Sequence, residues 1–332
     1  MPLINLPLSR EGKFSSMDDM KAAASPIPIL ILGTGGITKK VYFPLLIRWE
    51  NIKICGVFSK TQQHAKDACE RWQLPFWTTN IADLPELKAK AAFVLSNKES
   101  HFQLIKTLLE NGLDVYVEKP LAQTSQQAYE LAELAWKKQR ILMVGYNRRY
   151  ALLYRQARDI MKEKTIQLIV IQKHRTKSAY TSLNENYLED SIHQIDLMRF
   201  FCGDVEPLQT HYQMKDGKLQ SAISTVTLPG GGLGTILTSH TAGIWQESAA
   251  LHGENRSVHV NAFRDLWVRY EDHEELFGTD RAGKWVPDLK ERGFIPAIEH
   301  FFHCIQTREE PESNGLEAAK TQQLMERLVS GI

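Results

Sequence analysis

The feature that most constrains the fold is a series of short, uninterrupted aliphatic runs in the first half of the chain. Five such runs alternate with stretches of helical pattern, at 29–32, 52–58, 91–95, 114–117 and 141–144. An unbroken aliphatic run suits a strand buried on both faces, as the strands of a parallel sheet are. Helices that connect parallel strands require right-handed crossovers. The first half is therefore predicted to be an α/β Rossmann domain with a doubly wound parallel sheet.

The pattern changes after about residue 165, where strand-like runs follow one another with few helices between them. Several of these runs alternate polar and apolar residues, which fits an antiparallel sheet with one exposed face. One helix, at 190–201, interrupts them, and helical periodicity returns near the end of the chain. The predicted strands are 167–172, 208–214, 222–228, 233–239, 257–261 and 266–270. The second half is predicted to be an α+β domain with an open-faced, mostly antiparallel sheet.

A glycine-rich turn follows the first aliphatic run directly. Such a turn between strand and helix lets a pyrophosphate approach the backbone and meet the positive end of the helix. A tight turn without a ligand is the alternative, and the βαβ context favours dinucleotide binding. Thr38 stands where a third small residue is usual, and Pro44 lies in the following helix. The turn residues are Gly33, Thr34, Gly35, Gly36, Ile37 and Thr38.

The end of the second strand carries no carboxylate. A dinucleotide site that takes NAD usually has an Asp or Glu there for the ribose hydroxyls. Here the residues are Ser59, Lys60 and Thr61, a composition that suits the 2′-phosphate of NADP. In the alternative interpretation Thr61 caps the next helix and Lys60 is simply solvated. The sequence favours NADP over NAD as the cofactor.

Polar residues also follow three later strands of the first half. Ser96, Asn97 and His101 follow the third run, and Glu118 and Lys119 follow the fourth. The fifth run leads into the segment 145–149, which includes Arg148. Ligands of open α/β sheets gather at the carboxyl ends of the strands, so these side chains are expected to meet around a ligand. A surface ion pair at a strand end is the alternative for the charged pair.

With these motifs the chain resembles the glucose-fructose oxidoreductase, inositol dehydrogenase and rhizopine-catabolism family (Gfo/Idh/MocA). The resemblance rests on the E-K-P of Glu118, Lys119 and Pro120, on V-G-Y-N-R-R-Y at 144–150, and on the tail helix that begins at Phe294. It covers roughly residues 28 to 330. It implies NAD(P)-dependent oxidation or reduction of sugars, cyclitols or related alcohols. It also implies that the lysine of E-K-P lies beside the nicotinamide and the substrate.

The family often has D-x-G-x-H-x-x-D on a helix of its second domain. In this chain His193 and Asp196 match that pattern, Ser191 replaces the glycine, and Glu189 occupies the first aspartate with Asp190 next to it. The resemblance implies catalytic and substrate-binding roles for His193 and for one of the two carboxylates, with Asp190 preferred because it is three residues from His193. Alternatively, Asp190 is an N-cap and His193 a structural histidine.

Other polar groups give weaker signals. The segment 173–177 concentrates basic side chains, and Arg175, with Arg148, is predicted to bind substrate if that strand faces the cleft. An anionic substrate would then be recognised, whereas a solvated strand end is the alternative. No set of Cys, His and carboxylate residues converges as a metal site would require, and His300 and His303 are interpreted as packing or surface residues.

Composition excludes several other classes of protein. Lys and Arg total 40 against 39 for Asp and Glu, a net charge of +1 that argues against a nucleic-acid binder. Four scattered cysteines indicate reduced thiols and a cytoplasmic location. The start of the chain lacks the pattern of a signal peptide. The uncharged stretch 219–246 is broken by Pro229 and three glycines, which indicates a strand, a turn and a strand, so no membrane span is expected.

Together these observations predict a flexible tail at 1–25, a dinucleotide-binding domain at 26–147, and a substrate-binding and oligomerisation domain at 148–332. The predicted activity is hydride transfer between NADP or NAD and the CH–OH carbon of a sugar, polyol or related carbonyl compound. The protein is expected to form a homodimer or homotetramer through its open sheet. A catalytically silent, dinucleotide-sensing regulator on the same fold is the alternative.

Overall fold

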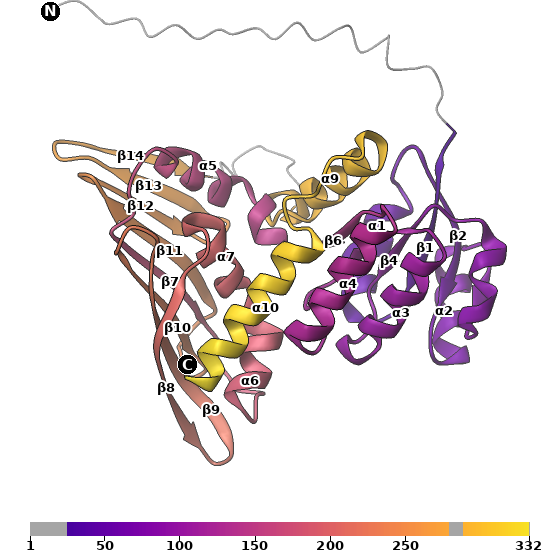
Figure 1. The fold of residues 1–332 in the computed structure, drawn as a ribbon, viewed down its shortest axis with the longest axis horizontal. Coiled ribbons are helices and arrows are strands. Elements are labelled where there is room, and N and C mark those ends of the chain that lie inside the picture. The colour runs from indigo at the N-terminus through magenta and orange to yellow at the C-terminus, as the bar shows by residue number, and fades with distance from the viewer. Residues whose placement is uncertain (1–24, 279–287, 332) are drawn as a thin grey trace, which may run out of the picture.

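The computed structural model describes residues 25–278 and 288–331. It contains two β-sheets, one on each side of the molecule, with a layer of helices between them (Figure 1). The predicted flexible tail, apart from residue 25, lies outside the described residues. Among the described helices, none is both long and apolar enough to cross a membrane.

The first sheet has six strands, all parallel, in the order β3-β2-β1-β4-β5-β6. This is the strand order of a Rossmann fold. The chain adds β2 and β3 on one side of β1 and then β4, β5 and β6 on the other, so the strand order switches between β1 and β4. The short edge strand β3 was not predicted, while β2 and β5 have the bounds that their aliphatic runs predicted. The strands are β1 (Ile27–Leu32), β2 (Ile52–Phe58), β3 (Trp77–Thr78), β4 (Ala91–Val94), β5 (Asp114–Val117) and β6 (Leu142–Val144).

Among the α-helices of this half, one begins at a capping side chain. The Thr124 hydroxyl, at the N-cap of the helix Ser125–Lys137, accepts a hydrogen bond from the Gln127 backbone N–H. The helix after the glycine turn begins with a π-helical turn, Thr38–Tyr42, and continues as α1 with Pro44 in its first turn. The helices are α1 (Phe43–Leu46), α2 (Gln62–Trp72), α3 (Lys98–Glu110) and α4 (Ser125–Lys137).

The second sheet has eight strands in the order β14-β13-β12-β11-β7-β10-β9-β8. All neighbours are antiparallel except β7 and β10, so the predicted fold class is confirmed. Two of its strands, β11 and β14, were not predicted. The strands are β7 (Leu168–His174), β8 (Glu206–Lys215), β9 (Lys218–Thr227), β10 (Leu233–Ser239), β11 (Gln246–Gly253), β12 (Arg256–Asn261), β13 (Asp265–Arg269) and β14 (Glu274–Gly278).

One face of this large sheet is covered by helices and the other carries none among the described residues (Figure 1). Residues on the inner face, such as Ile169 and Ile171, are fully buried, whereas Leu168 on the outer face is exposed. The helices of the second half are α5 (Leu152–Met161), α6 (Leu183–Asn186), α7 (Ile192–Cys202), α8 (Asp288–Glu291), α9 (Phe294–Thr307) and α10 (Gly315–Ser330).

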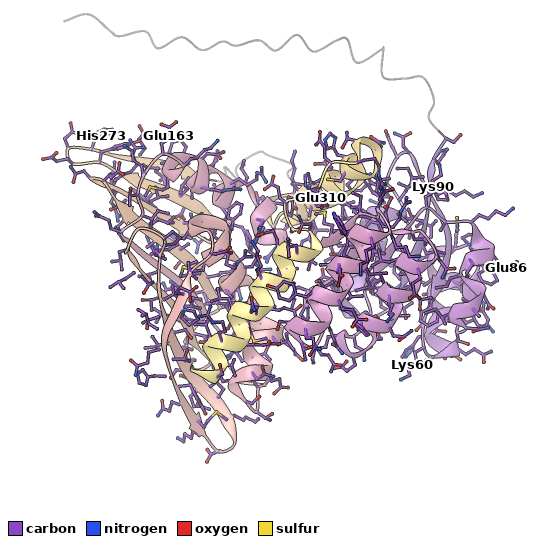
Figure 2. All side chains as sticks on the ribbon, viewed as in Figure 1. Lys60, Glu86, Lys90, Glu163, His273 and Glu310 are labelled. Carbon is purple, nitrogen blue, oxygen red and sulfur yellow. The ribbon has the colours of Figure 1, made fainter. Side chains whose placement is uncertain are left out.

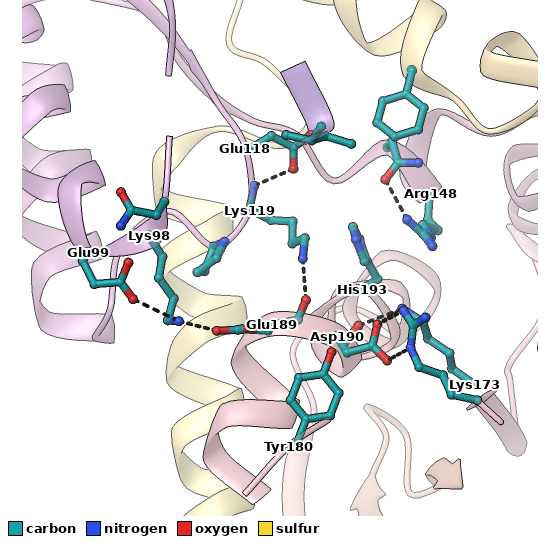
Figure 3. Close-up of a pocket in the computed structure, with 16 residues that line it drawn as sticks. Lys98, Glu99, Glu118, Lys119, Arg148, Lys173, Tyr180, Glu189, Asp190 and His193 are labelled. Atoms are coloured by element: carbon teal, nitrogen blue, oxygen red, sulfur yellow. Dashed lines mark hydrogen bonds and ion pairs between the residues drawn. The ribbon is translucent and has the colours of Figure 1, made fainter. Parts of the chain in front are cut away.

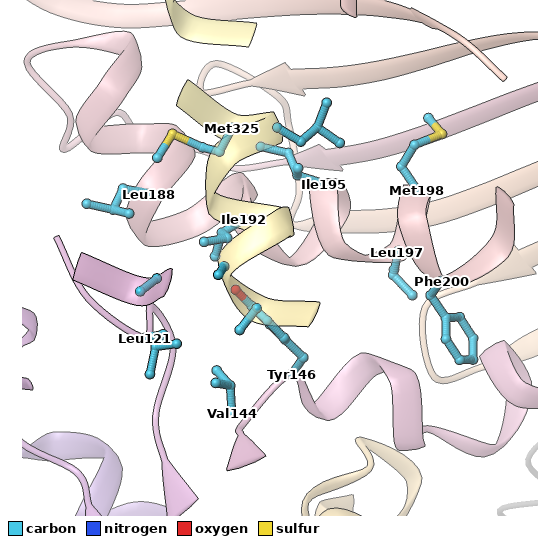
Figure 4. Packing of buried hydrophobic residues seen from close by; sticks show 14 of the residues in the cluster. Leu121, Val144, Tyr146, Leu188, Ile192, Ile195, Leu197, Met198, Phe200 and Met325 are labelled. Carbon is cyan, nitrogen blue, oxygen red and sulfur yellow. The ribbon is translucent and has the colours of Figure 1, made fainter. Parts of the chain in front are cut away.

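A continuous hydrophobic core joins the two sheets. Leu121 and Val144 from the first half pack in one cluster with Ile192, Ile195 and Met325 from the second (Figure 4). Helix α10 packs against both α4 and α7. Helix α9 packs on the face of the parallel sheet that carries Ile29 and Ile31. The last two helices therefore fix the relative position of the sheets and of the space between their functional edges.

Candidate active site

The glycine turn has the shape that a dinucleotide requires. Gly33 has a φ of +108°, and a Cβ there would lie 2.5 Å from the Ser96 backbone nitrogen, so only glycine fits. A Cβ at Gly35 or Gly36 would meet no atom within 4 Å, which leaves the outer side of the turn open to a ligand. The Thr38 hydroxyl is buried and has no hydrogen-bond partner among the described residues. The residues present therefore fit a pyrophosphate at this turn.

The end of β2 bears the groups predicted to select the cofactor. Ser59 is buried, and its hydroxyl accepts a hydrogen bond from the Thr34 hydroxyl at 3.3 Å. Thr61 takes the N-cap position of α2, but its side chain makes no capping hydrogen bond. Lys60 projects from the surface (Figure 2) and forms no ion pair with any described residue. Both Lys60 and Thr61 are thus available to an anionic group.

A cavity of about 550 Å³ lies where the carboxyl ends of β4 and β5 face the second half of the chain. From the first half it is lined by Ile37, Asn97, Lys98, Glu99, Glu118 and Lys119. From the second half it is lined chiefly by Arg148, Lys173, Arg175, Tyr180, Asp190 and His193. The cavity thus connects the glycine turn, through Ile37, with the charged groups of the second sheet (Figure 3).

Lys119 enters the cavity from the end of β5. Its ammonium group donates a hydrogen bond to the backbone carbonyl of Glu189, and its peptide bond to Pro120 is cis. Burial lowers the pKa of Lys119 below its ordinary value, and the charge of Arg148 acts in the same direction. Glu118 and Asp190 oppose this shift. Lys119 forms no ion pair with any described residue, so its charge is the least compensated in the cavity.

Asp190 faces Lys119 from a π-helical turn, Tyr187–Ser191, that leads into α7. Its carboxylate accepts hydrogen bonds from Lys173 at 2.6 Å and from Arg175 Nε at 2.6 Å. Although burial opposes ionisation, the hydrogen bond from Arg175 and the charge of Lys173 hold the pKa of Asp190 well below its usual range. Asp190 is therefore an anion that binds two cations, and it does not serve as the N-cap of a helix.

His193 lies one helical turn after Asp190, and its ring lines the cavity beside Lys119 (Figure 3). Burial lowers the pKa of His193 well below its usual value, and the charges of Arg148 and Lys119 lower it further. Its Nδ1 atom is buried without a hydrogen-bond partner in the described part of the chain. At neutral pH the ring is therefore a neutral imidazole with an unused nitrogen, which is a signature of a functional group.

Arg148 lines the cavity and is bound to the second sheet. Its guanidinium group makes a bidentate pair with Glu247 on β11, at 3.0 and 3.1 Å. Burial raises the pKa of Glu247, but the charges of Arg148 and Lys173 outweigh it, so the pKa of Glu247 lies below its ordinary value. Tyr154 adds a hydrogen bond to the same carboxylate at 3.3 Å. Arg148 is thus held rigidly at the cavity and its charge is already neutralised.

The structure brings part of the predicted site together at the cavity, while the rest of the glycine turn and the residues 59–61 lie outside its lining. The predicted residues that line it are Ile37, Asn97, Glu118, Lys119, Arg148, Arg175, Asp190 and His193. Two predicted cofactor residues, His101 and Ser96, have their side chains bonded within the protein. The His101 ring is buried between the carbonyls of Pro120 and Ser96, at 2.7 and 3.1 Å, and does not line the cavity. The Ser96 hydroxyl is bonded to Ser100. Asp196, which matched the family pattern, forms a buried pair with Arg149 instead.

Sequence reasoning also missed several groups that line or support the cavity. Lys98 binds the Glu189 side chain, and the Tyr180 ring lines the wall. Glu247 was missed because the strand that carries it was not predicted. Lys98 stood directly after Asn97 at a strand end, and this position was the available signal. For Tyr180 and Glu247 the sequence contained no comparable signal.

Comparison with known proteins agrees with this geometry. Residues 27–146 match the model of an oxidoreductase family with an NAD-binding Rossmann fold, Gfo/Idh/MocA. The chain is 29% identical to the putative oxidoreductase YceM of Salmonella typhimurium over 300 residues, which are 90% of this chain and 95% of the relative. It is 27% identical to the inositol 2-dehydrogenase/D-chiro-inositol 3-dehydrogenase of Lactiplantibacillus plantarum over 60% of this chain and 61% of that one.

A solved structure extends the likeness to the whole fold. The crystal structure of the dehydrogenase MviM from Clostridium difficile superimposes with a TM-score of 0.83 at 28% identity, over 92% of this chain and 99% of that one. The matched Rossmann domain, the full-length relative and the shared two-sheet architecture agree with each other. Residues 27–146 therefore belong to the Gfo/Idh/MocA family of oxidoreductases, and the full-length likeness of the chain agrees with that assignment.

Proposed function

We propose that the protein interconverts an alcohol and a carbonyl group of a sugar, polyol or related compound, using NADP or NAD. The observation that carries this proposal is the pairing of Lys119 with His193 in one cavity. Lys119 offers an ammonium group whose charge no carboxylate neutralises, and His193 offers a neutral imidazole with an unused nitrogen. A hydrogen-bond donor and a proton acceptor are the two groups that an alcohol oxygen needs during oxidation.

The dinucleotide would be held by the turn at 33–38, with Ser59, Lys60 and Thr61 at its adenosine end and Asn97 and Lys119 toward the cavity. When bound, the nicotinamide supplies the group that accepts or donates hydride. The absence of a carboxylate after β2 supports NADP as the preferred cofactor, because Lys60 and Thr61 can bind a phosphate.

Lys119 would donate a hydrogen bond to the reacting oxygen in place of its present bond to the Glu189 carbonyl. Its positive charge stabilises negative charge that develops on that oxygen. His193 would accept the alcohol proton, and its lowered pKa leaves the ring unprotonated at neutral pH. Asp190 would fix the helix that carries His193, since its carboxylate is bound to Lys173 and Arg175 on the second sheet.

The inositol dehydrogenase among the relatives supports a polyhydroxylated substrate. The polar cavity supports the same class, because hydroxyl groups can bind its many donors and acceptors. We also propose that residues 26–147 bind the cofactor, that residues 148–332 bind substrate, and that the open sheet mediates a homo-oligomer in the cytoplasm.

The test is a panel of sugars and polyols with each cofactor, read at the absorbance of the reduced nicotinamide. Lys119→Met should reduce turnover by about 10²–10⁴-fold, the typical contribution of a positioned acid–base group. His193→Ala should lose a comparable factor, and the double variant should lose less than the product if the two groups act together. Lys106→Met, an exposed lysine paired with Glu130 on the surface, is the matched control. Turnover by Lys119→Met at the level of this control would exclude the lysine and favour a dinucleotide-sensing regulator.

A further inference from the structure

Two buried tyrosines lie next to each other beside Glu118, and one of them, Tyr42, is bonded to its carboxylate. The hydroxyl of Tyr42, which is fully buried, donates a hydrogen bond to Glu118 Oε1 at 2.5 Å and lies 3.2 Å from the Tyr116 hydroxyl. The other carboxylate oxygen of Glu118 accepts the backbone N–H of Lys119 at 3.2 Å. Glu118 thus bridges the Tyr42 hydroxyl and the Lys119 backbone.

The position of Tyr42 in the chain shows which elements this bridge joins. Tyr42 ends the π-helical turn Thr38–Tyr42, in the helix that follows the glycine turn. Such π-helical turns are rare in proteins, and many of those that occur lie at functional sites. The Tyr42 ring is enclosed by Phe93, Tyr116 and Phe294, with ring centroids 5.8 to 6.2 Å away, so its hydroxyl has one fixed position. The helix that begins at the glycine turn is therefore tied to the strand end that carries Lys119.

We infer that Tyr42 is a positioning residue that holds the Glu118 carboxylate against the backbone of Lys119. In this arrangement the cofactor-binding helix sets both the place and the electrostatic surroundings of the lysine. The inference depends on the proposed function only for the role of Lys119 in turnover. The contact from Tyr42 through Glu118 to Lys119 exists whatever the reaction is.

The charges around the pair determine what loss of the tyrosine hydroxyl does. Burial raises the pKa of Glu118 above its ordinary value, and the hydrogen bond from Tyr42 and the charges of Lys119 and Arg148 oppose this rise without cancelling it. Burial is the largest effect on Lys119 and lowers its pKa, and the positive charge of Arg148 lowers it further. The negative charges of Glu118, Asp190 and Glu189 raise it. Without the Tyr42 hydroxyl, the Glu118 carboxylate loses the donor that fixes its Oε1 atom. Its negative charge is then held less closely to Lys119, so the pKa of Lys119 falls.

Competitive acetylation of Lys119 across a range of pH, read by peptide mass spectrometry on the full chain, measures this pKa without turnover. Tyr42→Phe should lower the labelling midpoint of Lys119 by up to about one pH unit, because displacing a nearby charge has less effect than removing it. Tyr116→Phe is the matched control, because Tyr116 is equally buried and does not bond to Glu118. The labelling midpoint of Lys119 in Tyr116→Phe should equal that in the wild type. Glu118→Gln should lower the midpoint at least as far as Tyr42→Phe does.

The double variant Tyr42→Phe/Glu118→Gln should match Glu118→Gln alone, because the tyrosine acts through the carboxylate. Equal midpoints for Tyr42→Phe and Tyr116→Phe, or additive shifts in the double variant, would overturn the inference. If Tyr42→Phe does not fold, an unchanged midpoint in Glu118→Gln overturns it as well. Normal turnover by Lys119→Met would refute the proposed function and leave these labelling results unaffected, so the two failures are distinguishable.

Discussion

Lys173 allows the electrostatics of the cavity to be tested through stability. It lies on the inner face of β7, is 2% exposed, and is bound to the Asp190 carboxylate. Burial, with the charge of Arg148, lowers the pKa of Lys173 from 10.5 to about 8, even though Asp190 opposes the shift. The folded protein therefore holds the Lys173 proton less tightly than the unfolded chain does. At about 1.36 kcal/mol for each pH unit, the charged lysine costs the fold about 3 kcal/mol below pH 8.

The sign of the pH dependence follows from linkage. Between about pH 8 and pH 10.5 the unfolded chain retains the Lys173 proton and the folded chain has lost it, so the free energy of unfolding rises with pH. Most of this cost, on the order of 2–3 kcal/mol, should be recovered between pH 7 and pH 10. Lys173→Met cannot take part because it has no charge, and Lys173→Arg cannot because arginine stays protonated. Neither variant should show the recovery.

Urea unfolding of the three proteins at pH 7 and pH 10, followed by fluorescence, measures these differences. Other groups also titrate in this range, but they are common to the three chains and cancel when each variant is compared with the wild type. The wild type should therefore gain on the order of 2–3 kcal/mol more than either variant from pH 7 to pH 10. An equal gain in all three would refute the claim that Lys173 is buried with its charge opposed by burial and Arg148.

The other predictions concern the cofactor, the assembly and the substrate. Lys60→Ala should weaken NADP(H) binding by about tenfold in calorimetry and leave NAD(H) binding unchanged, because a charge-assisted hydrogen bond is worth about 1.5–3 kcal/mol; a clear NAD(H) preference in both proteins would contradict this. Ile223→Glu, on the uncovered face of the large sheet and 46% exposed, should dissociate the oligomer in light scattering, whereas a monomeric wild type at micromolar concentration would rule out the interface. Arg175→Ala should raise KM more for an acidic substrate than for a neutral one if Arg175 recognises an anion, and equal effects would limit it to holding Asp190.

The parts of the fold that were predictable are those where burial alone decides the sequence. Strands β2 and β5 follow their aliphatic runs residue for residue, because most of their side chains are buried or half-buried in the parallel sheet. Strand β11 escaped prediction since it begins with Gln246 and Glu247, which resemble surface residues. Its glutamate is buried only because Arg148, about 100 positions earlier in the chain, supplies the compensating charge. Such a partner is specified by the tertiary fold and cannot be recognised from the local sequence.

The site was predictable in its chemistry and less so in its protonation. Lys119 and His193 were found from a family pattern, and the structure places both at one cavity. A histidine with its reference pKa near 6.5 would be expected to exchange protons near neutrality. That expectation was wrong in degree, because burial and four neighbouring cations lower the pKa of His193 well below that value. Those cations come from separate segments of the chain, and only folding shows that they surround one ring.

The distribution of charge in the cavity bears on what the substrate can be. Five basic side chains line it, yet four already have carboxylate partners: Lys98 with Glu189, Arg148 with Glu247, and Lys173 and Arg175 with Asp190. A substrate carboxylate would have to compete with Asp190 for Arg175, at the cost of leaving a buried charge unpaired. A neutral polyol needs no such exchange. It acquires negative charge only at its reacting oxygen, and the one described cavity cation without a carboxylate partner, Lys119, is the group that can stabilise it.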